Sequence, residues 1–191
     1  MTKKLLVVFA VAVSMISTSA FAKTQGNYIG LDAVYTNDKA VDSANNRRGD
    51  RNLGAGVSYK YALNFNNFFI APVAFFNSNN SKVTITEGAN SSVNKLKYSY
   101  GAKLDLGYDI TDRLAVFVSG GYGELRRHIE VSGTSAQSLN TYEAAIYGAG
   151  IKYSLDNMVD LNLAYEYFDY NNVLRNDTNI DQVKLGLSFN F

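Results

Sequence analysis

A strict alternation of apolar and polar residues is the strongest pattern in the chain. It is clearest between Leu96 and Asp109, where every second side chain is apolar and the residues between them are charged, small or polar. Successive side chains of a β-strand point to opposite faces, so this period of two predicts strands with one apolar and one polar face. After residue 22 the sequence shows no helical periodicity. The pattern therefore predicts an all-β fold.

Eight stretches of the chain are predicted to be strands. Six alternate clearly, and two, around Pro72 and Val118, are assigned from their length and from their β-branched and aromatic residues. The predicted strands cover residues 29–35, 53–61, 68–76, 96–109, 114–123, 145–153, 159–167 and 183–191. Short turns are expected near 64–67, 109–113 and 156–158, and long polar loops near 37–51, 77–94, 124–141 and 169–180. Short turns alternating with long loops are typical of antiparallel transmembrane barrels, whose turns are periplasmic and whose four long loops here would be extracellular.

The composition of the two faces indicates which one points outward. Glycines are frequent on the polar face, where they would weaken a solvated strand but fit a narrow lumen. Tyrosines near the strand ends of the apolar face suit the aromatic girdles of a membrane barrel. We therefore expect the apolar face to meet lipid, including Leu96, Val116, Val118 and Tyr122. The alternative is a soluble barrel with its apolar face inside.

The first 22 residues are predicted to be a cleaved secretory signal peptide. Lys3 and Lys4 precede an apolar run, residues 5–16, which is shorter than the roughly 20 residues of a membrane-spanning helix. Small residues then lead to Ala20-Phe21-Ala22, which fits an A-x-A cleavage site. The barrel domain would then be residues 23–191, exported to the outer membrane of a bacterial cell.

Composition narrows the chemistry further. The chain has 18 basic and 17 acidic residues and a formal net charge of +1, and it contains no cysteine. This balance gives no indication of a nucleic-acid partner, and thiol chemistry is excluded. The sequence has no metal-ligand cluster, phosphate-binding loop or cofactor motif, so no cofactor is expected.

The leader, the eight alternating stretches and the final Ser188-Phe189-Asn190-Phe191 together resemble the small outer-membrane β-barrel family of opacity-protein-like surface antigens and porin-like proteins. The resemblance implies a surface protein with a structural or interaction role and no catalysis, surrounded by outer-membrane lipid and lipopolysaccharide. In that family a terminal aromatic residue with alternating apolar partners is read by the barrel-assembly machinery. Here that assembly signal would consist of Leu185, Leu187, Phe189 and Phe191.

Charged residues on the polar face predict a network inside the barrel. Opposite charges in a narrow lumen can pair, whereas unpaired ones would each cost several kcal/mol. The expected network consists of Lys60, Lys103, Asp105, Glu166 and Lys184. Eight strands leave an interior filled by side chains, so a structural network is favoured. A narrow channel is the alternative.

Arginines in the predicted loops suggest two kinds of surface contact. Arg48-Gly49-Asp50 lies in the first long loop and matches the integrin-binding tripeptide, which would make the chain an adhesin for a host-cell surface protein. Alternatively, guanidinium groups in the loops could bind lipopolysaccharide phosphates in bidentate geometry. The arginines concerned are Arg47, Arg48, Arg51, Arg126 and Arg127.

The single histidine, His128, raises an enzymatic alternative. On a strand continued into the third loop, His128, Glu130 and Ser132 would share a face, as a base and a nucleophile must. Outer-membrane barrels that modify lipid A use such groups near their outer rim. No family motif surrounds these residues, and a solvated loop histidine is the simpler interpretation.

Overall fold

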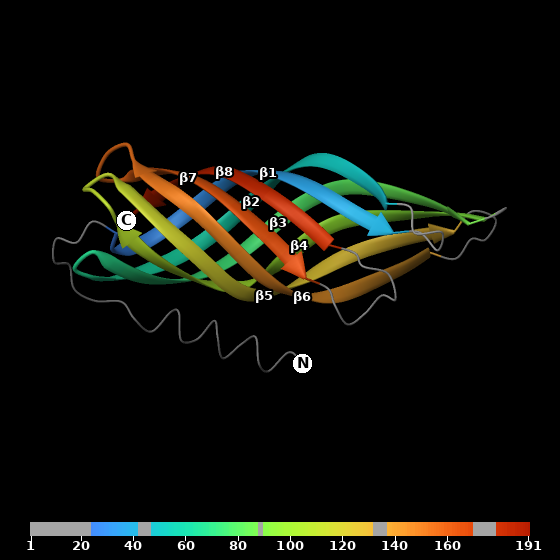
Figure 1. Ribbon diagram of the computed structural model, residues 1–191, viewed down its shortest axis with the longest axis horizontal. Helices are drawn as coiled ribbons and strands as arrows, with labels where there is room; N and C mark the ends of the chain where they lie inside the picture. Colours follow the sequence, from blue (N-terminus) through green and yellow to red (C-terminus); the bar gives the residue numbers. More distant parts are fainter. Residues whose placement is uncertain (1–23, 42–46, 88–89, 132–136, 170–178) are drawn as a thin grey trace.

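The computed structural model describes residues 24–41, 47–87, 90–131, 137–169 and 179–191. These residues form strands that close into one barrel (Figure 1). The strands are β1 (Gly26–Val41), β2 (Arg47–Phe65), β3 (Phe68–Glu87), β4 (Asn90–Asp109), β5 (Leu114–Val131), β6 (Gln137–Ser154), β7 (Val159–Asp169) and β8 (Asn179–Asn190). Each pairs antiparallel with its neighbour in sequence, and β8 pairs with β1. The predicted eight-stranded antiparallel barrel is confirmed.

The two ends of the barrel differ, as the loop lengths predict. Short turns join β2 to β3, β4 to β5 and β6 to β7 at one end, which we call the turn end and where Phe191 also lies (Figure 1). In the tightest turn Asn66 has φ 66°, a left-handed conformation that asparagine tolerates better than most residues. We call the opposite end the hairpin end.

Most of the sequence predicted as long loops is in fact strand. The β1–β2 ladder continues to Val41 and Arg47, and the β3–β4 ladder continues to Glu87 and Asn90. Ladder hydrogen bonds join backbone groups whatever the side chains are, so a strand can continue after its apolar alternation has ended. The predicted signal peptide lies outside the described residues. No helix long and apolar enough to cross a membrane occurs among the residues described.

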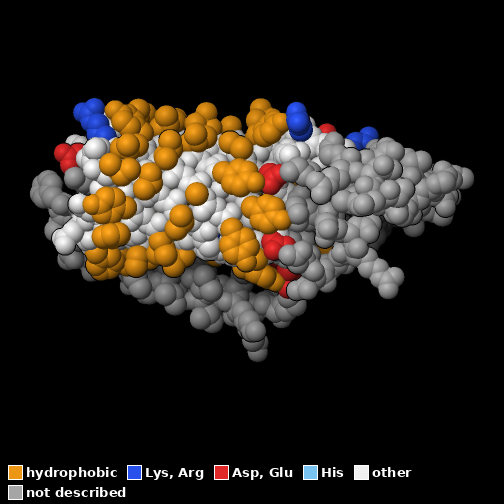
Figure 2. Space-filling model, viewed as in Figure 1, with side chains coloured by type: hydrophobic (Ala, Val, Ile, Leu, Met, Phe, Trp, Pro, Cys, Tyr) orange, Lys and Arg blue, Asp and Glu red, His pale blue; other side chains and the backbone are white. Residues whose placement is uncertain are grey.

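The apolar face of the strands points outward over the turn-end half of the barrel. Figure 2 shows hydrophobic side chains covering this half, and Val116, Val118 and Tyr122 are among the exposed ones, as expected. In β3 both faces are apolar because Phe76 points outward while Phe69 and Phe75 are buried inside. The soluble alternative, with the apolar face inside, is therefore wrong.

Leu96 is an exception to the predicted faces. The β4–β5 pairing shifts between Leu96 and Tyr98, so that Lys97 is an extra residue in β4. Lys97 is exposed and Leu96 is completely buried. A β-bulge places two consecutive residues on the same side of a strand. The alternation therefore assigns Leu96 to the wrong face.

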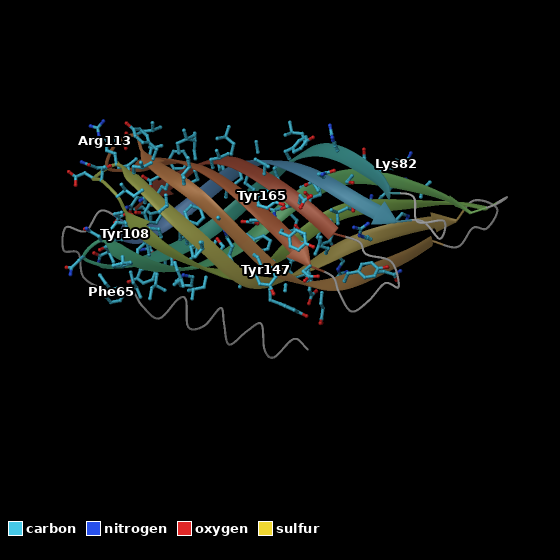
Figure 3. The ribbon with its side chains drawn as sticks, in the orientation of Figure 1. Phe65, Lys82, Tyr108, Arg113, Tyr147 and Tyr165 are labelled. Atoms are coloured by element: carbon cyan, nitrogen blue, oxygen red, sulfur yellow. The ribbon has the colours of Figure 1, made fainter. Side chains whose placement is uncertain are left out.

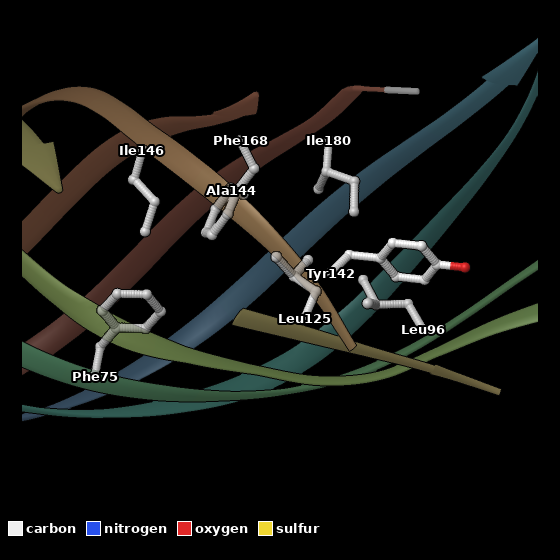
Figure 4. Packing of buried hydrophobic residues seen from close by; sticks show 8 residues of the cluster. All are labelled: Phe75, Leu96, Leu125, Tyr142, Ala144, Ile146, Phe168 and Ile180. Carbon is white, nitrogen blue, oxygen red and sulfur yellow. The ribbon is translucent and has the colours of Figure 1, made fainter. Parts of the chain in front are cut away.

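The lumen is more apolar than the sequence suggests. Toward the hairpin end it holds a cluster formed by Phe75, Leu96, Leu125, Tyr142, Ala144, Ile146, Phe168 and Ile180 (Figure 4). A second cluster consists of Tyr28, Ala62, Phe69, Ala71, Ala115, Phe117 and Ala164. Glycines make room for its rings, because a Cβ on Gly107 would collide with Phe69 and one on Gly150 with Phe117. Large rings beside small residues fill the narrow interior.

Candidate functional site: the lumen and the outer rim

Four of the five predicted lumen charges form one connected network. The Lys103 Nζ lies 2.8 Å from Glu166 Oε1 and 3.2 Å from Asp105 Oδ1. The Lys184 Nζ lies 2.7 Å from the other oxygen of Glu166, Oε2. Each of these side chains is less than a tenth exposed. Glu166 of β7 thus joins a lysine of β4 to a lysine of β8 and links distant parts of the barrel wall.

The fifth predicted residue, Lys60, makes a different contact. Its Nζ lies 4.8 Å from the centre of the Tyr28 ring, a cation–π geometry. Among the described residues it forms no ion pair within 4.0 Å. A cavity of about 50 Å³ is lined by Lys60 and by residues of the network, and also by Asp32 and Ser58. This volume accommodates a few water molecules, which is far less than a channel requires.

A second polar cluster lies at the turn end. The Lys152 Nζ donates to Thr24 Oγ1 at 2.6 Å and lies 3.5 Å from Asp160 Oδ2. Thr24 in turn donates to Asp109 at 2.5 Å, and Asn64 donates to the same carboxylate at 2.9 Å. Sequence reasoning left this cluster out, although alternation places Lys152 and Asp160 on the polar face. The cluster attaches the residues before β1 to the inside of the barrel.

A third polar cluster lies at the hairpin end. Arg127 donates to Asp38 Oδ1 at 2.8 Å, and Ser81 donates to Asp38 Oδ2 at 3.4 Å. Gln182 donates to Thr36 at 3.3 Å. All five side chains are buried. Sequence reasoning missed these contacts because three of the residues fall in predicted loops, where no face can be assigned.

The arginines expected at the surface fall into different environments. Arg127 points inward and is buried against Asp38, so its predicted contact with lipopolysaccharide is wrong. Arg126 points outward, 6.0 Å from the centre of the Tyr98 ring. Arg51 is exposed on β2. The side chains of Arg47 and Arg48 lie outside the described residues.

The Arg48-Gly49-Asp50 tripeptide lies in a strand, not in a loop as predicted. Its residues pair with Ala40, Lys39 and Asp38 in the β1–β2 ladder. The Asp50 carboxylate accepts a hydrogen bond from the Lys82 backbone nitrogen at 2.5 Å. The tripeptide therefore has an extended backbone, and its carboxylate is engaged within the chain.

His128 lies in β5 and pairs with Lys95 of β4. Alternation from the buried Arg127 places its side chain on the outer face. The Glu130 side chain and Ser132 lie outside the described residues, so the proposed grouping of these three residues stays a prediction. Among the residues described, no three His, Asp, Glu or Cys side chains come together as metal ligands.

Tyrosines and carboxylates form a ring where the outer apolar surface ends toward the hairpin end. Tyr147 and Tyr165 belong to this ring (Figure 3). Tyr165 donates to Asp181 at 2.7 Å. Tyr122 donates to Glu143 and Tyr100 to Glu124 in the same manner. Figure 2 shows acidic side chains next to aromatic rings at this boundary.

Among the side chains that the structure describes, the charges on the outer face around this ring separate by sign. We call the outward positions on β2 to β5 the basic sector: Arg51, Lys82, Lys95, Lys97 and Arg126. We call those on β5 to β8 the acidic sector: Glu124, Glu143, Asp169 and Asp181. The two sectors meet on β5, where Glu124 and Arg126 are two residues apart. Together they form a rim of opposite charge on opposite sides of the barrel.

The predicted assembly signal lies on the outer face of β8. Leu185, Leu187 and Phe189 are exposed, and Phe191 is 67% exposed just beyond the strand. The Phe191 nitrogen donates to the Asn27 carbonyl at 3.0 Å. The terminal aromatic ring thus continues the line of outward apolar side chains, while its role in assembly stays a prediction.

Comparison with known proteins agrees with this architecture. Residues 8–191 match the family model described as "Outer membrane protein beta-barrel domain". No curated protein matches the chain. The fold is similar to that of Ail from Yersinia pestis, solved with the heparin analogue sucrose octasulfate, at 14% identity and a TM-score of 0.60 over 88% of this chain and 100% of Ail.

Two further solved structures share the fold. Neisserial surface protein A is 18% identical, with a TM-score of 0.60 over 87% of this chain and 98% of that protein. OprG from Pseudomonas aeruginosa is 16% identical, with a TM-score of 0.51 over 88% of this chain and 97% of OprG. The family indicates a bacterial outer membrane, with the hairpin end outside the cell. The chain belongs to the outer-membrane protein β-barrel domain family.

Proposed function

We propose that this chain is a non-catalytic surface-interaction protein, a closed barrel that anchors in the outer membrane and presents its hairpin end to the exterior. One observation carries this proposal. The ion pairs Lys103–Glu166 and Glu166–Lys184, 2.8 and 2.7 Å long, connect β4, β7 and β8 through the middle of the lumen. A barrel closed in this way acts through its outer surface.

Energetics support the closed state. Separating a buried ion pair leaves uncompensated charges, which costs about 3–5 kcal/mol when one partner is lost. The apolar cluster around Phe75 and Leu125 fills the lumen on the hairpin side of the network. Conduction would require the ion-pair network and the apolar cluster to open at the same time. The narrow channel is therefore the less favoured function.

Conductance across a planar bilayer tests the closed lumen. The folded protein, purified without its leader, should give no steady open level at moderate voltage. A sixteen-stranded porin, which holds a water channel, serves as the control for bilayer and insertion. A stable conductance of the wild-type protein would contradict the proposal.

Lipopolysaccharide of the outer leaflet would surround the rim. The basic sector lies just outside the tyrosine ring, at the level where the phosphates of the outer leaflet are expected. Lys82 and Lys97 are exposed there, and cations near an anionic membrane surface are attracted to it. We expect these side chains to contact lipopolysaccharide phosphates.

Lipid retention tests this contact. The amount of lipopolysaccharide that copurifies in mild detergent should fall in the Lys82→Gln/Lys97→Gln variant. Arg113→Gln is the matched control, because Arg113 is an exposed cation at the turn end (Figure 3). Equal retention by all three proteins would rule out the contact.

A further inference from the structure

The charge pattern of the rim offers complementary surfaces on one molecule. The basic sector covers β2 to β5, and the acidic sector covers β5 to β8. Lys82, Lys97 and Arg51 are exposed in the first sector. Opposite charges at an interface set its register and exclude wrong partners. A partner that complements the whole rim should therefore carry an acidic surface for the basic sector and a basic surface for the acidic sector.

Tyrosines orient the acidic sector. The Tyr165 hydroxyl donates to Asp181 at 2.7 Å, and the Tyr122 hydroxyl donates to Glu143. Each of these carboxylates accepts a hydrogen bond from an amphipathic ring at the edge of the apolar surface. A carboxylate can accept about four hydrogen bonds, so a carboxylate oriented by a tyrosine can also bind a cation on a neighbouring molecule.

We propose that copies of this chain associate side by side in the membrane, with the acidic sector of one copy against the basic sector of the next. Membrane insertion gives all copies the same depth and the same direction. The relative orientation of two copies then differs only by rotation about the membrane normal, and the rim charges favour the rotation that places opposite sectors together. This inference does not depend on whether the lumen is closed.

A second copy complements both sectors of this rim, whereas lipopolysaccharide complements only the basic sector, where it can bind wherever no neighbouring copy lies. Lipopolysaccharide phosphates can neutralise the basic sector, but they repel Glu143 and Asp181. A neighbouring copy supplies carboxylates to the basic sector and ammonium groups to the acidic sector. Because the contact joins two different surfaces, it is heterologous, and repeating it produces rows of copies.

Disulfide cross-linking tests the arrangement, because the chain has no cysteine of its own. Ser78→Cys places a thiol in the basic sector, where Ser78 is exposed on β3 opposite Tyr98. Tyr167→Cys places one in the acidic sector, opposite Asp181. The double variant should form a ladder of linked oligomers under mild oxidation. Each single variant should remain monomeric, because a heterologous contact does not bring identical positions together.

Charge reversal identifies the cause of the ladder. In the double-cysteine background, Glu143→Lys/Asp181→Lys makes the rim basic on both sides, and Lys82→Glu/Lys97→Glu makes most of it acidic. Each reversed protein alone should lose the ladder, and mixing the two should restore it. A heat-dependent shift in gel migration verifies that every variant is folded.

The same measurements in phosphatidylcholine vesicles separate protein contacts from lipid bridges. We expect the ladder to form there without lipopolysaccharide. A ladder that appears only when lipopolysaccharide is added would show that lipid joins the copies and would overturn the proposal. So would a ladder that persists in either reversed protein alone, or the absence of a ladder in the unreversed protein.

Discussion

Arg127 and Asp38 form a buried ion pair of 2.8 Å at the hairpin end of the barrel, whereas Arg126, one residue earlier, lies on the outer surface beside Tyr98. A strand sends neighbouring side chains to opposite faces, so two adjacent arginines have different roles. Arg127 stabilises the inside of the barrel. Arg126 contributes charge to the rim.

Replacing Arg127 with methionine should destabilise the barrel strongly. The change leaves Asp38 buried without its ion-pair partner, and such losses cost about 3–5 kcal/mol. Urea unfolding in lipid vesicles measures the free energy of unfolding. Arg126→Met is the control and should change it little. The Asp38→Leu/Arg127→Met pair should recover part of the loss, and a pair as unstable as the single variant would contradict this explanation.

Two adjacent glycines should respond in opposite ways to alanine. A Cβ on Gly121 would lie 2.6 Å from the Lys103 Cα, whereas a Cβ on Gly120 would meet nothing within 4 Å. Gly121→Ala should therefore cost about 1–3 kcal/mol through overpacking. Gly120→Ala should be neutral or stabilise by up to about 1 kcal/mol, because glycine is unfavourable in strands. Thermal unfolding of both variants provides the comparison, and equal effects would refute the assigned faces.

Neutralising Glu166 should weaken the lumen network. Glu166→Gln leaves Lys103 and Lys184 without the carboxylate that they share, so the free energy of unfolding should fall by several kcal/mol. Glu143→Gln, at a carboxylate on the outer face, is the matched control and should have a small effect. Urea titration measures the free energy of unfolding of both proteins. A similar decrease in the two would argue against a structural network.

Cysteine labelling should reveal the bulge in β4. Lys97→Cys should react with a membrane-impermeant maleimide on intact cells, since Lys97 is exposed. Leu96→Cys should stay unreactive until the protein is unfolded, because Leu96 is completely buried. An uninterrupted strand would expose residue 96 and bury residue 97. The reverse labelling pattern would therefore show that the bulge is absent.

Removing Phe191 should impair assembly more than stability. The ring is 67% exposed, so little packing is lost, whereas the predicted assembly signal loses its terminal aromatic group. We expect less folded barrel in the outer membrane, measured as the heat-modifiable band. Phe191→Tyr should preserve it. Normal accumulation of the deletion variant would remove Phe191 from the signal.

Alternation in the sequence predicts the strands, their antiparallel order and the outward face of the apolar residues. These features depend on the period of two along the strand, which each segment carries by itself. The same alternation places Lys103, Asp105, Glu166 and Lys184 on the inner face. It fails at Leu96, because a bulge arises from the pairing of two strands and not from either strand alone.

The sequence by itself determined the eight-stranded barrel, its narrow lumen and the face that contacts lipid. These features follow from local periodicity and from the limited interior of eight strands. Only the tertiary structure decided the contacts between distant strands. It joined Asp38 to Arg127, buried Arg127 while exposing Arg126, and placed the Arg48-Gly49-Asp50 tripeptide in a ladder. It also separated the rim charges by sign, because closure of the barrel fixes which strands lie on the same side.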